Sequence, residues 1–434
     1  MRRFAGGIHP DYHKEFSKQE TIRNAPVPER LIVPLTQHIG VPCKPEVSPG
    51  EQVAEGQLIG QATGVISANI HAPVSGRVRH LERAPHPLGS KTLAVIIERD
   101  GELRRSYLKP LGDEVETLDP SRLRERVRQA GIVGLGGAAF PAHVKYSPPK
   151  VKSIDTLIIN GCECEPYLTA DFRIMVERTL EVILGARLIA RILGTPRILI
   201  AVESDKLEAV ARLRQEGKRW TECVVLPARY PQGAEKVLIK VVLNREVPLG
   251  GLPLDVSVVV ANVGTALAVA EAVRDGKPLI ERVVTVTGNA VKRPGNFSVR
   301  IGTPLSVLIE AAGGLAQKSG KIVMGGPMMG VAQYSPDTPV IKGTSGILVL
   351  TEEEAVEQNY LPCIRCSFCV KVCPMRLLPS TLSLIGEHRK WEMARDYGVF
   401  DCIECGCCTY VCPAKRPIVQ WIKETKAHLR AKQG

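Results

Sequence analysis

The sequence predicts a multidomain protein of mixed α/β and α+β class, and three observations carry this prediction. The chain has 434 residues, which exceeds one ordinary core because domains average about 150 residues. Apolar strands alternate with helical segments from about residue 131 to 274, as in a sheet with helices packed against it. Near the C-terminus, one cysteine pattern occurs twice.

The first segment, 29–98, reads as short apolar strands separated by Gly and Pro turns, which predicts a small all-β unit. Its stretches around 50–60 and 71–78 resemble the barrel-sandwich fold of biotinyl and lipoyl carrier domains. The tight turn at 75–77 reads SGR and lacks the carrier lysine, so we expect a structural role. His38 and His71 lie in this segment and are also expected to be structural.

The middle of the chain begins with a charged amphipathic helix predicted at 120–130. Strands such as TLIIN, RILIAV, CVVLP and VSVVVAN then alternate with helical stretches, the longest being FRIMVERTLEVILGARLIARIL. Residues 282–330 return to short strands plus one helix, SVLIEAAGG, which predicts a small α+β module.

The composition, apolar runs and net charge of the chain limit the classes of function that we expect. The hydrophobic fraction of 44% indicates a folded globular chain, and the longest uncharged run, 256–270, is too short to span a bilayer. The N-terminus lacks the apolar stretch of a secretory signal, so we expect the protein to remain in the cytoplasm. A net charge of +12 suits an acidic partner or an anionic membrane surface. Nucleic acid is not expected, because no recognition motif accompanies the charge.

The doubled cysteine motif has the spacing C-x2-C-x2-C-x3-C-P, which holds iron–sulfur cubes. Three thiolates bind one [4Fe-4S] cluster and the fourth reaches the neighbouring cluster. Cys412 is therefore assigned to the first cluster and Cys373 to the second. Zinc or a redox disulfide is the weaker alternative. The predicted ligands are Cys363, Cys366, Cys369, Cys373, Cys402, Cys405, Cys408 and Cys412.

Other features of the C-terminal region are less specific. Cys407 falls outside the repeat and is expected to be a spare or buried thiol. The linker between the motifs has helical periodicity. In the last stretch, a helix would place an apolar face opposite basic residues, and two roles stay open: membrane or partner docking, or a cover for the cluster domain. The face comprises Ile418, Ile422, Thr425 and Leu429, and the basic residues are Lys423, Lys426, Arg430 and Lys432.

The stretch GLGGAAFPAHVK, 134–145, is a second candidate site. A glycine cluster lets backbone N–H groups approach a phosphate or flavin edge, and a following lysine adds positive charge. It matches neither the P-loop nor the dinucleotide fingerprint, so a plain glycine-rich turn is an equal alternative from spacing alone. NGCECEP follows at 160–166. Cys162 and Cys164 are too isolated for a metal site, and Cys164 is expected to be packed.

These motifs resemble the flavin-binding subunit of respiratory complex I, which carries a GxGGAxFPxxxK loop and an N-x-x-E-x-E-P segment. YPQGAEK at 230–236 and ANVGT at 261–265 resemble two further flavin-site segments of that family. The closer likeness, over nearly the whole chain, is to the C subunit of Rnf-type ferredoxin:NAD+ oxidoreductase complexes. GGIHPDYHK, SANIHAPVSG, NGCECEP, GGPMMG and LPCIRCSFC carry it.

The resemblance implies four domains in order: an N-terminal barrel-sandwich hybrid (1–105), a Rossmann-like FMN/NADH-binding α/β domain (120–275), a β-grasp, SLBB-like module (276–345) and a helical two-[4Fe-4S] ferredoxin-like domain (346–434). It places Glu163 and Glu165 near the isoalloxazine or nicotinamide as catalytic candidates. Two departures from the complex I pattern, Leu135 and Cys162, put contacts at those positions in doubt. The implied cofactor-binding residues are Gly134, Gly136, Gly137, Phe140, Lys145, Asn160, Tyr230, Gly233, Glu235, Asn262 and Thr265.

The implied function is hydride exchange between NAD(H) and noncovalent FMN, with single electrons relayed through two [4Fe-4S] clusters. The resemblance implies a peripheral subunit at the cytoplasmic face of the cell membrane. Its expected partners are membrane-embedded subunits that translocate ions, iron–sulfur subunits, and ferredoxin reached through one of them. The alternatives are a soluble reductase of the cobalamin reductase type, in which the barrel-sandwich follows the clusters, and a noncatalytic relay in which only the clusters work.

Overall fold

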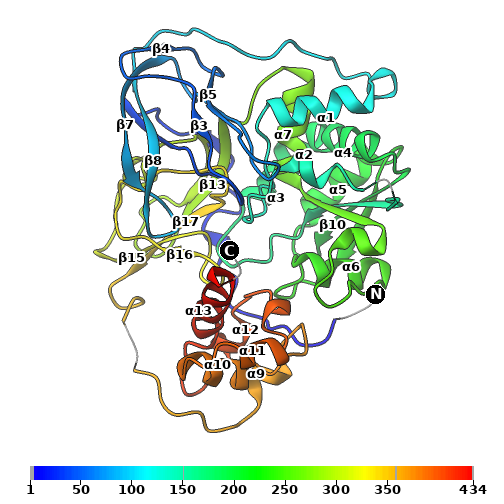
Figure 1. Ribbon diagram of the computed structural model, residues 1–434, viewed down its shortest axis with the longest axis vertical. Coiled ribbons are helices and arrows are strands. Elements are labelled where there is room, and N and C mark those ends of the chain that lie inside the picture. The colour runs from blue at the N-terminus through cyan, green and yellow to red at the C-terminus, as the bar shows by residue number, and fades with distance from the viewer. Residues whose placement is uncertain (1–3, 150, 357–358, 433–434) are drawn as a thin grey trace.

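The computed structural model describes residues 4–149, 151–356 and 359–432. The extreme ends of the first and last predicted domains, 1–3 and 433–434, lie outside the described residues. The chain forms a β-rich unit, an α/β unit, a second β-rich unit and a helical C-terminal unit, which pack together (Figure 1). This order confirms the predicted fold class.

The first unit packs two small antiparallel sheets against each other. Its strands are β2 (Arg30–Pro34), β3 (Lys44–Pro45), β4 (Gln52–Val53), β5 (Leu58–Gln61), β6 (Ile70–His71), β7 (Gly76–Pro85) and β8 (Lys91–Arg99). One sheet has the order β2-β8-β7-β4 and the other β3-β5-β6. Ser75 in the turn before β7 is buried, and its hydroxyl donates to Arg104 O at 2.6 Å. The turn that would carry a prosthetic lysine is therefore tied into the fold.

The two histidines of this unit that were expected to be structural, His38 and His71, are buried. Burial lowers the pKa of His38 to about 4 and that of His71 to about 3. Neutral imidazoles inside a β-rich unit agree with the structural role that we expected for them.

The α/β unit is built on a parallel sheet. Its elements are η2 (Val115–Thr117), α1 (Pro120–Gln129), α2 (Ala142–Lys145), β9 (Thr156–Gly161), α3 (Ala170–Glu177), α4 (Thr179–Leu193), β10 (Arg197–Glu203), α5 (Leu207–Gly217), β11 (Glu222–Leu226), α6 (Glu235–Leu243), η3 (Pro253–Val256), β12 (Val258–Asn262) and α7 (Val263–Arg274). The strand order is β11-β10-β9-β12, with every pair parallel. β9, β10 and β12 are nearly continuous apolar runs because helices cover both faces of such a sheet.

This strand order creates a switch point. From β9 the chain builds outward through β10 to β11, and then returns to place β12 on the other side of β9. In open parallel sheets, ligands bind in the crevice at the carboxyl ends of the strands where the order reverses. The carboxyl ends of β9 and β12 are therefore the expected ligand site.

The prediction of one long helix across 172–193 is wrong in one respect: the structure has two helices there, α3 and α4, with a break at Arg178. Arg178 leaves the helical conformation, with φ −125° and ψ 34°. Its guanidinium contacts Glu181 and Glu271, each at 3.0 Å, so the break lets Arg178 join α4 to α7. Further along, a Cβ at Gly185 would lie 1.8 Å from Ala266 O, so only glycine allows α4 and α7 this close approach.

The second β-rich unit has a six-stranded mixed sheet. Its elements are β13 (Glu281–Thr287), β14 (Gly295–Arg300), α8 (Leu305–Ala311), β15 (Ser319–Met324), β16 (Val331–Ala332) and β17 (Gly346–Thr351), joined from the N-terminal segment by β1 (Ile22–Asn24). The order is β1-β14-β13-β17-β15-β16. The four domain boundaries stay predictions, and this sheet takes strands from both sides of 276–345.

The helical unit carries the cysteine motifs. Its elements are α9 (Phe368–Lys371), α10 (Pro379–Glu387), α11 (Met393–Asp396), η4 (Val399–Asp401), α12 (Cys407–Tyr410) and α13 (Ile418–Ala431). The predicted apolar face of α13 is buried in this unit, so the helix covers the cluster domain. Lys426 is an exception to the expected solvated basic face, because it is buried and its Nζ donates to Cys402 O at 2.5 Å.

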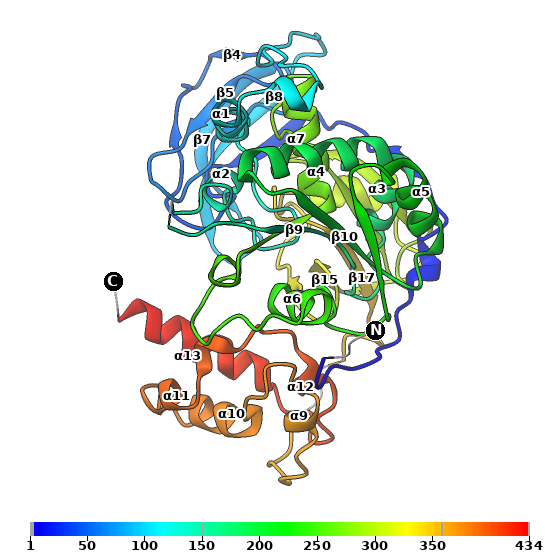
Figure 2. The same cartoon turned by 90° about the vertical axis from the view of Figure 1, so that its right-hand side faces the viewer.

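The N-terminal segment links these units. Figure 2 shows it passing beside α12 on its way to the α/β unit. Gly7 N donates to Val372 O at 2.8 Å, and Ile8 exchanges backbone hydrogen bonds with Tyr230 at 2.8 and 3.0 Å. The segment therefore contacts the helical and α/β units at the place where they meet.

Candidate functional site

Two asparagines stand at the switch point. Asn160 is the penultimate residue of β9, and its side chain accepts from Cys162 N at 3.1 Å and donates to Gly233 O at 2.9 Å. Asn262 ends β12 and caps α7 by accepting from Gly264 N at 2.8 Å. Each side chain thus fixes the loop that follows its strand, and both were predicted cofactor-binding residues.

The glycine-rich loop lies over the start of α7. Leu135 N donates to Thr265 Oγ1 at 2.9 Å, and a Cβ at Gly136 would lie 3.5 Å from Asn262 Cβ. Gly136 and Gly137 are exposed, and Gly137 has φ +102° with open space where a Cβ would be. An exposed backbone beside a helix N-terminus suits a phosphate or flavin edge.

Two further predicted residues, Lys145 at the end of α2 and Glu235 at the start of α6, lie next to each other. Lys145 Nζ lies 2.5 Å from Glu235 Oε1. Gly233 N donates to Cys164 Sγ at 3.4 Å, and burial raises the pKa of this thiol. Cys164 is therefore a packed thiol, as expected. The structure brings the glycine loop, the strand ends and the YPQGAEK segment together, although these segments are distributed over residues 134–265 of the sequence.

The two candidate glutamates are held by different elements. The Glu163 carboxylate accepts from Asp171 N at 2.7 Å and Phe172 N at 3.1 Å, at the start of α3. The Glu165 carboxylate accepts from Met328 N at 2.7 Å and Met329 N at 2.9 Å in the GGPMMG segment. Burial raises the pKa of Glu165. Both carboxylates are fixed by backbone amides, and their catalytic assignment stays a prediction.

Sequence reasoning missed two groups at this site. Asp171 accepts from Asn262 Nδ2 at 2.6 Å, and burial next to the charge of Glu163 raises its pKa to about 7. Lys14 contacts the turn that carries the two glutamates. Asp171 could have been suspected from its position at a helix start near NGCECEP, whereas the only signal for Lys14 was its place in GGIHPDYHK.

Tyr230 joins the α/β unit to the cysteine motifs. Its side chain is buried, and its hydroxyl donates to Cys405 O at 2.7 Å. Ile8, Cys164, Met328 and Cys407 pack in the same cluster. Cys407 is fully buried there, which agrees with a packed thiol. The second cysteine motif thus lies directly against a segment of the candidate flavin site.

The structure groups the cysteines across the two motifs. One cavity in the helical unit is lined by five cysteines: Cys373 of the first motif, and Cys402, Cys405, Cys407 and Cys408 of the second. Within the described residues, no three His, Cys, Asp or Glu side chains converge on a site for a single ion. Without Cys407, which falls outside the repeat, the other four fit a cube in which each thiolate binds a different iron, and they are the crossed set that the motif predicts.

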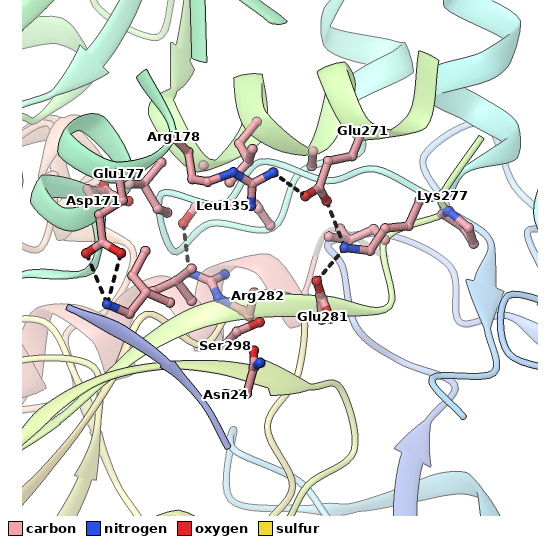
Figure 3. Close-up of a pocket in the computed structure, with 18 residues that line it drawn as sticks. Asn24, Leu135, Asp171, Glu177, Arg178, Glu271, Lys277, Glu281, Arg282 and Ser298 are labelled. Atoms are coloured by element: carbon pink, nitrogen blue, oxygen red, sulfur yellow. Dashed lines mark hydrogen bonds and ion pairs between the residues drawn. The ribbon is translucent and has the colours of Figure 1, made fainter. Parts of the chain in front are cut away.

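A larger cavity, of about 300 Å³, lies between α3, α7 and the six-stranded sheet (Figure 3). Three of its charged side chains form ion pairs: Glu271 contacts Arg178 at 3.0 Å and Lys277 at 3.1 Å. Arg282 Nη2 donates to Leu135 O at 3.4 Å. The cavity therefore borders the glycine-rich loop at Leu135.

In the part of the chain that the structure describes, no helix is both long and apolar enough to cross a membrane.

Comparisons with known families agree with this arrangement. Residues 2–102 match the RnfC barrel sandwich hybrid domain, 127–271 the Nuo51 FMN-binding domain, 283–332 the SLBB domain and 362–415 the 4Fe-4S dicluster domain. Among solved structures, an NAD+-reducing [NiFe]-hydrogenase has a TM-score of 0.53 at 18% identity, over 74% of this chain and 64% of that one. This likeness concerns the fold alone.

Several curated proteins are similar over almost the whole chain. The C subunit of the proton-translocating ferredoxin:NAD(+) oxidoreductase complex of Clostridium ljungdahlii is 46% identical, over 99% of this chain and 95% of that protein. The C subunit of the Na(+)-translocating complex of Acetobacterium woodii is 43% identical, over 99% and 98%. The C subunit of the ion-translocating oxidoreductase complex of Rhodobacter capsulatus is 43% identical, over 99% and 83%.

Fold and site together define an oxidoreductase subunit with an FMN-binding domain and a domain for two [4Fe-4S] clusters. The chain belongs to the family of C subunits of ion-translocating ferredoxin:NAD(+) oxidoreductase complexes. The predicted family, oxidoreductase class and cofactors are thereby confirmed, and the family is one of subunits of multisubunit complexes.

Proposed function

We propose that this subunit exchanges hydride between NAD(H) and FMN at the switch point and relays single electrons through its two clusters. The observation that carries the proposal is the bond from Tyr230, in a flavin-site segment, to Cys405 of the second motif. FMN supplies the step from a hydride pair to single electrons. A buried contact between the two sites gives these electrons a short route.

We assign the residues to two roles. Backbone of the glycine loop, with Lys145, Asn160, Asn262 and Thr265, would hold FMN, and the Glu163–Glu165 turn would border the dinucleotide. The cofactor-binding set is completed by Gly134, Gly136, Gly137, Phe140, Tyr230, Gly233 and Glu235. These groups bind and orient, and the fixed carboxylates place negative charge where nicotinamide gains or loses positive charge.

The two clusters would have different surroundings. Cys405 is buried in the cluster around Tyr230 and Cys408 in the core of the helical unit, whereas Cys363 and Cys366 are partly exposed. Beside the first motif, three apolar side chains face solvent: Leu361, Ile364 and Phe368 are 61%, 67% and 48% exposed. We place the electron exchange with an iron–sulfur partner subunit here, because one-electron transfer needs a cluster near the contact surface.

A proposal for the role of this chain within a complex follows from the names of its relatives. Their names describe complexes that translocate protons or Na(+). We propose that membrane-embedded partner subunits perform translocation, that this chain lies peripherally at the cytoplasmic face, and that ferredoxin exchanges electrons through a partner subunit.

Glu165→Gln tests the site assignment. Glutamine keeps an oxygen that can accept from Met328 N and Met329 N but removes the negative charge. We expect flavin reduction by NADH to slow on the order of 100-fold, with FMN content unchanged. Anaerobic stopped-flow absorbance measures the rate, and released FMN fluorescence measures the content.

Glu177→Gln is the matched control. Glu177 also accepts a backbone N–H, from Ile22 at 3.0 Å, but lines the cavity of Figure 3. Glu177→Gln should leave the rate of flavin reduction by NADH unchanged. An equal loss of FMN and rate in Glu165→Gln would move Glu165 into the FMN-binding shell and contradict its assignment to the dinucleotide.

A further inference from the structure

Lys14 is a buried ammonium that is bound mainly by backbone oxygens. It begins the short helix η1 (Lys14–Phe16) of the N-terminal segment. Its Nζ donates to Glu163 O at 2.7 Å, Glu165 O at 3.1 Å and Leu168 O at 2.7 Å. One side chain from the start of the chain thus fills the inside of the turn that carries both candidate glutamates.

The turn has a backbone that needs such support. Glu163 has φ +46° and Tyr167 has φ +67°, both positive values that residues other than glycine rarely adopt. The three carbonyls of this turn that Lys14 binds are buried or partly buried, where an unpaired oxygen would be costly. Three donors on one ammonium satisfy all three oxygens at once.

Neighbouring charges do not replace this role. Lys206, the other buried lysine of the region, pairs with Glu203 at 3.1 Å and Asp205 at 3.0 Å. Lys206 is thus held by these two carboxylates, and the carbonyls of the turn are left to Lys14.

The side chains of the turn reach three different elements. Glu163 caps α3, Cys164 accepts from Gly233 N, and Glu165 binds the amides of Met328 and Met329. A shift of the turn would therefore move the carboxylates and the YPQGAEK segment together.

We propose that Lys14 is a positioning residue for hydride exchange: its ammonium holds the 163–168 turn in the conformation that presents Glu163 and Glu165 to the flavin site. This inference rests on the proposed function. The Lys14 ammonium donates to the turn and, within the described residues, to none of the predicted FMN-binding residues. Its loss should therefore slow flavin reduction without removing FMN.

The test compares Lys14→Ala and Lys14→Met with wild type as FMN-loaded, full-length protein. We expect FMN content to be kept and flavin reduction by NADH to slow on the order of 100-fold, the effect of a misplacement of about 1 Å. Ethylammonium added to Lys14→Ala should restore part of the rate, because it can fill the space with a new donor. Lys14→Met keeps the apolar stem and should not respond to the amine.

Lys342→Met is the matched control. Lys342 is also fully buried, and its Nζ donates to two carbonyls, Asn69 O at 2.5 Å and Gly131 O at 2.6 Å, outside the turn. In Lys342→Met, NADH should reduce the flavin at the wild-type rate. A wild-type rate in Lys14→Ala, or a rate that falls only in step with FMN loss and is not rescued by ethylammonium, would overturn the inference.

Hydrogen exchange separates this inference from the proposed function. If NADH fails to reduce even the wild-type flavin, the proposed function fails. In that case amide exchange at 163–169 still decides the positioning claim: faster exchange in Lys14→Ala but not in Lys342→Met supports it, and unchanged exchange overturns it.

Discussion

A chain that ends after Ala355, and so lacks both cysteine motifs, is expected to keep FMN and to be reduced by NADH but to lose electron delivery to a one-electron acceptor such as ferredoxin. Every predicted flavin contact lies within 134–265, and the first predicted cluster ligand is Cys363. The halves should therefore be chemically separable. Anaerobic absorbance follows flavin reduction, and a ferredoxin reduction assay follows delivery.

The position of the cut matters. β17, Gly346–Thr351, lies between β13 and β15 in the six-stranded sheet, so a cut before it would remove an interior strand. Ending at Ala355 keeps β17 and the backbone bond from Ala355 N to Thr351 O. Delivery at the full-length rate would show that the clusters are not the route. Loss of FMN with an intact circular dichroism spectrum would show that the flavin site extends into the helical unit.

The second large effect is the crossed loss of clusters. Cys412→Ser should lower iron from about eight to about four per chain and remove the cluster of Cys363, Cys366 and Cys369. Cys373→Ser should remove the other cluster instead, because Cys373 lines the cavity formed by the second motif. Iron analysis gives the count, and electron paramagnetic resonance of the reduced protein identifies the remaining cluster.

Cys407→Ser is the control for this pair. Cys407 lies between Cys405 and Cys408 in the sequence but is not one of the four repeated cysteine positions. Its thiol is fully buried. It should keep both clusters. If Cys412→Ser instead damages the cluster of its sequence neighbours, the ligands do not cross.

Much of this architecture follows from local sequence rules. The cysteine spacing predicts the cluster ligands because neighbouring thiolates must reach one cube. The apolar strand runs predict the parallel sheet, whose strand ends carry Asn160 and Asn262. The apolar face of α13 was recognisable from its period, and only its buried Lys426 was not.

The rest depends on long-range contacts that no local pattern encodes. β1 pairs with β14 across more than half of the chain. Lys14 binds carbonyls that lie 149 to 154 residues away. Glu165 is held by Met328 of the GGPMMG segment, which had no assigned partner. The break at Arg178 serves a contact with Glu271 on another helix. Each needs the tertiary fold before its reason is visible.

A rapid anaerobic mix of the FMN- and cluster-loaded full chain with NADH tests the proposed electron path from nicotinamide through flavin to the clusters. Absorbance and freeze-quench electron paramagnetic resonance would follow the flavin and the clusters in the same reaction. We expect the flavin band to bleach first and reduced clusters to appear afterwards at the expense of reduced flavin. A flavin band that stays unbleached by NADH, or clusters that are reduced while the flavin remains oxidised throughout, would contradict this path.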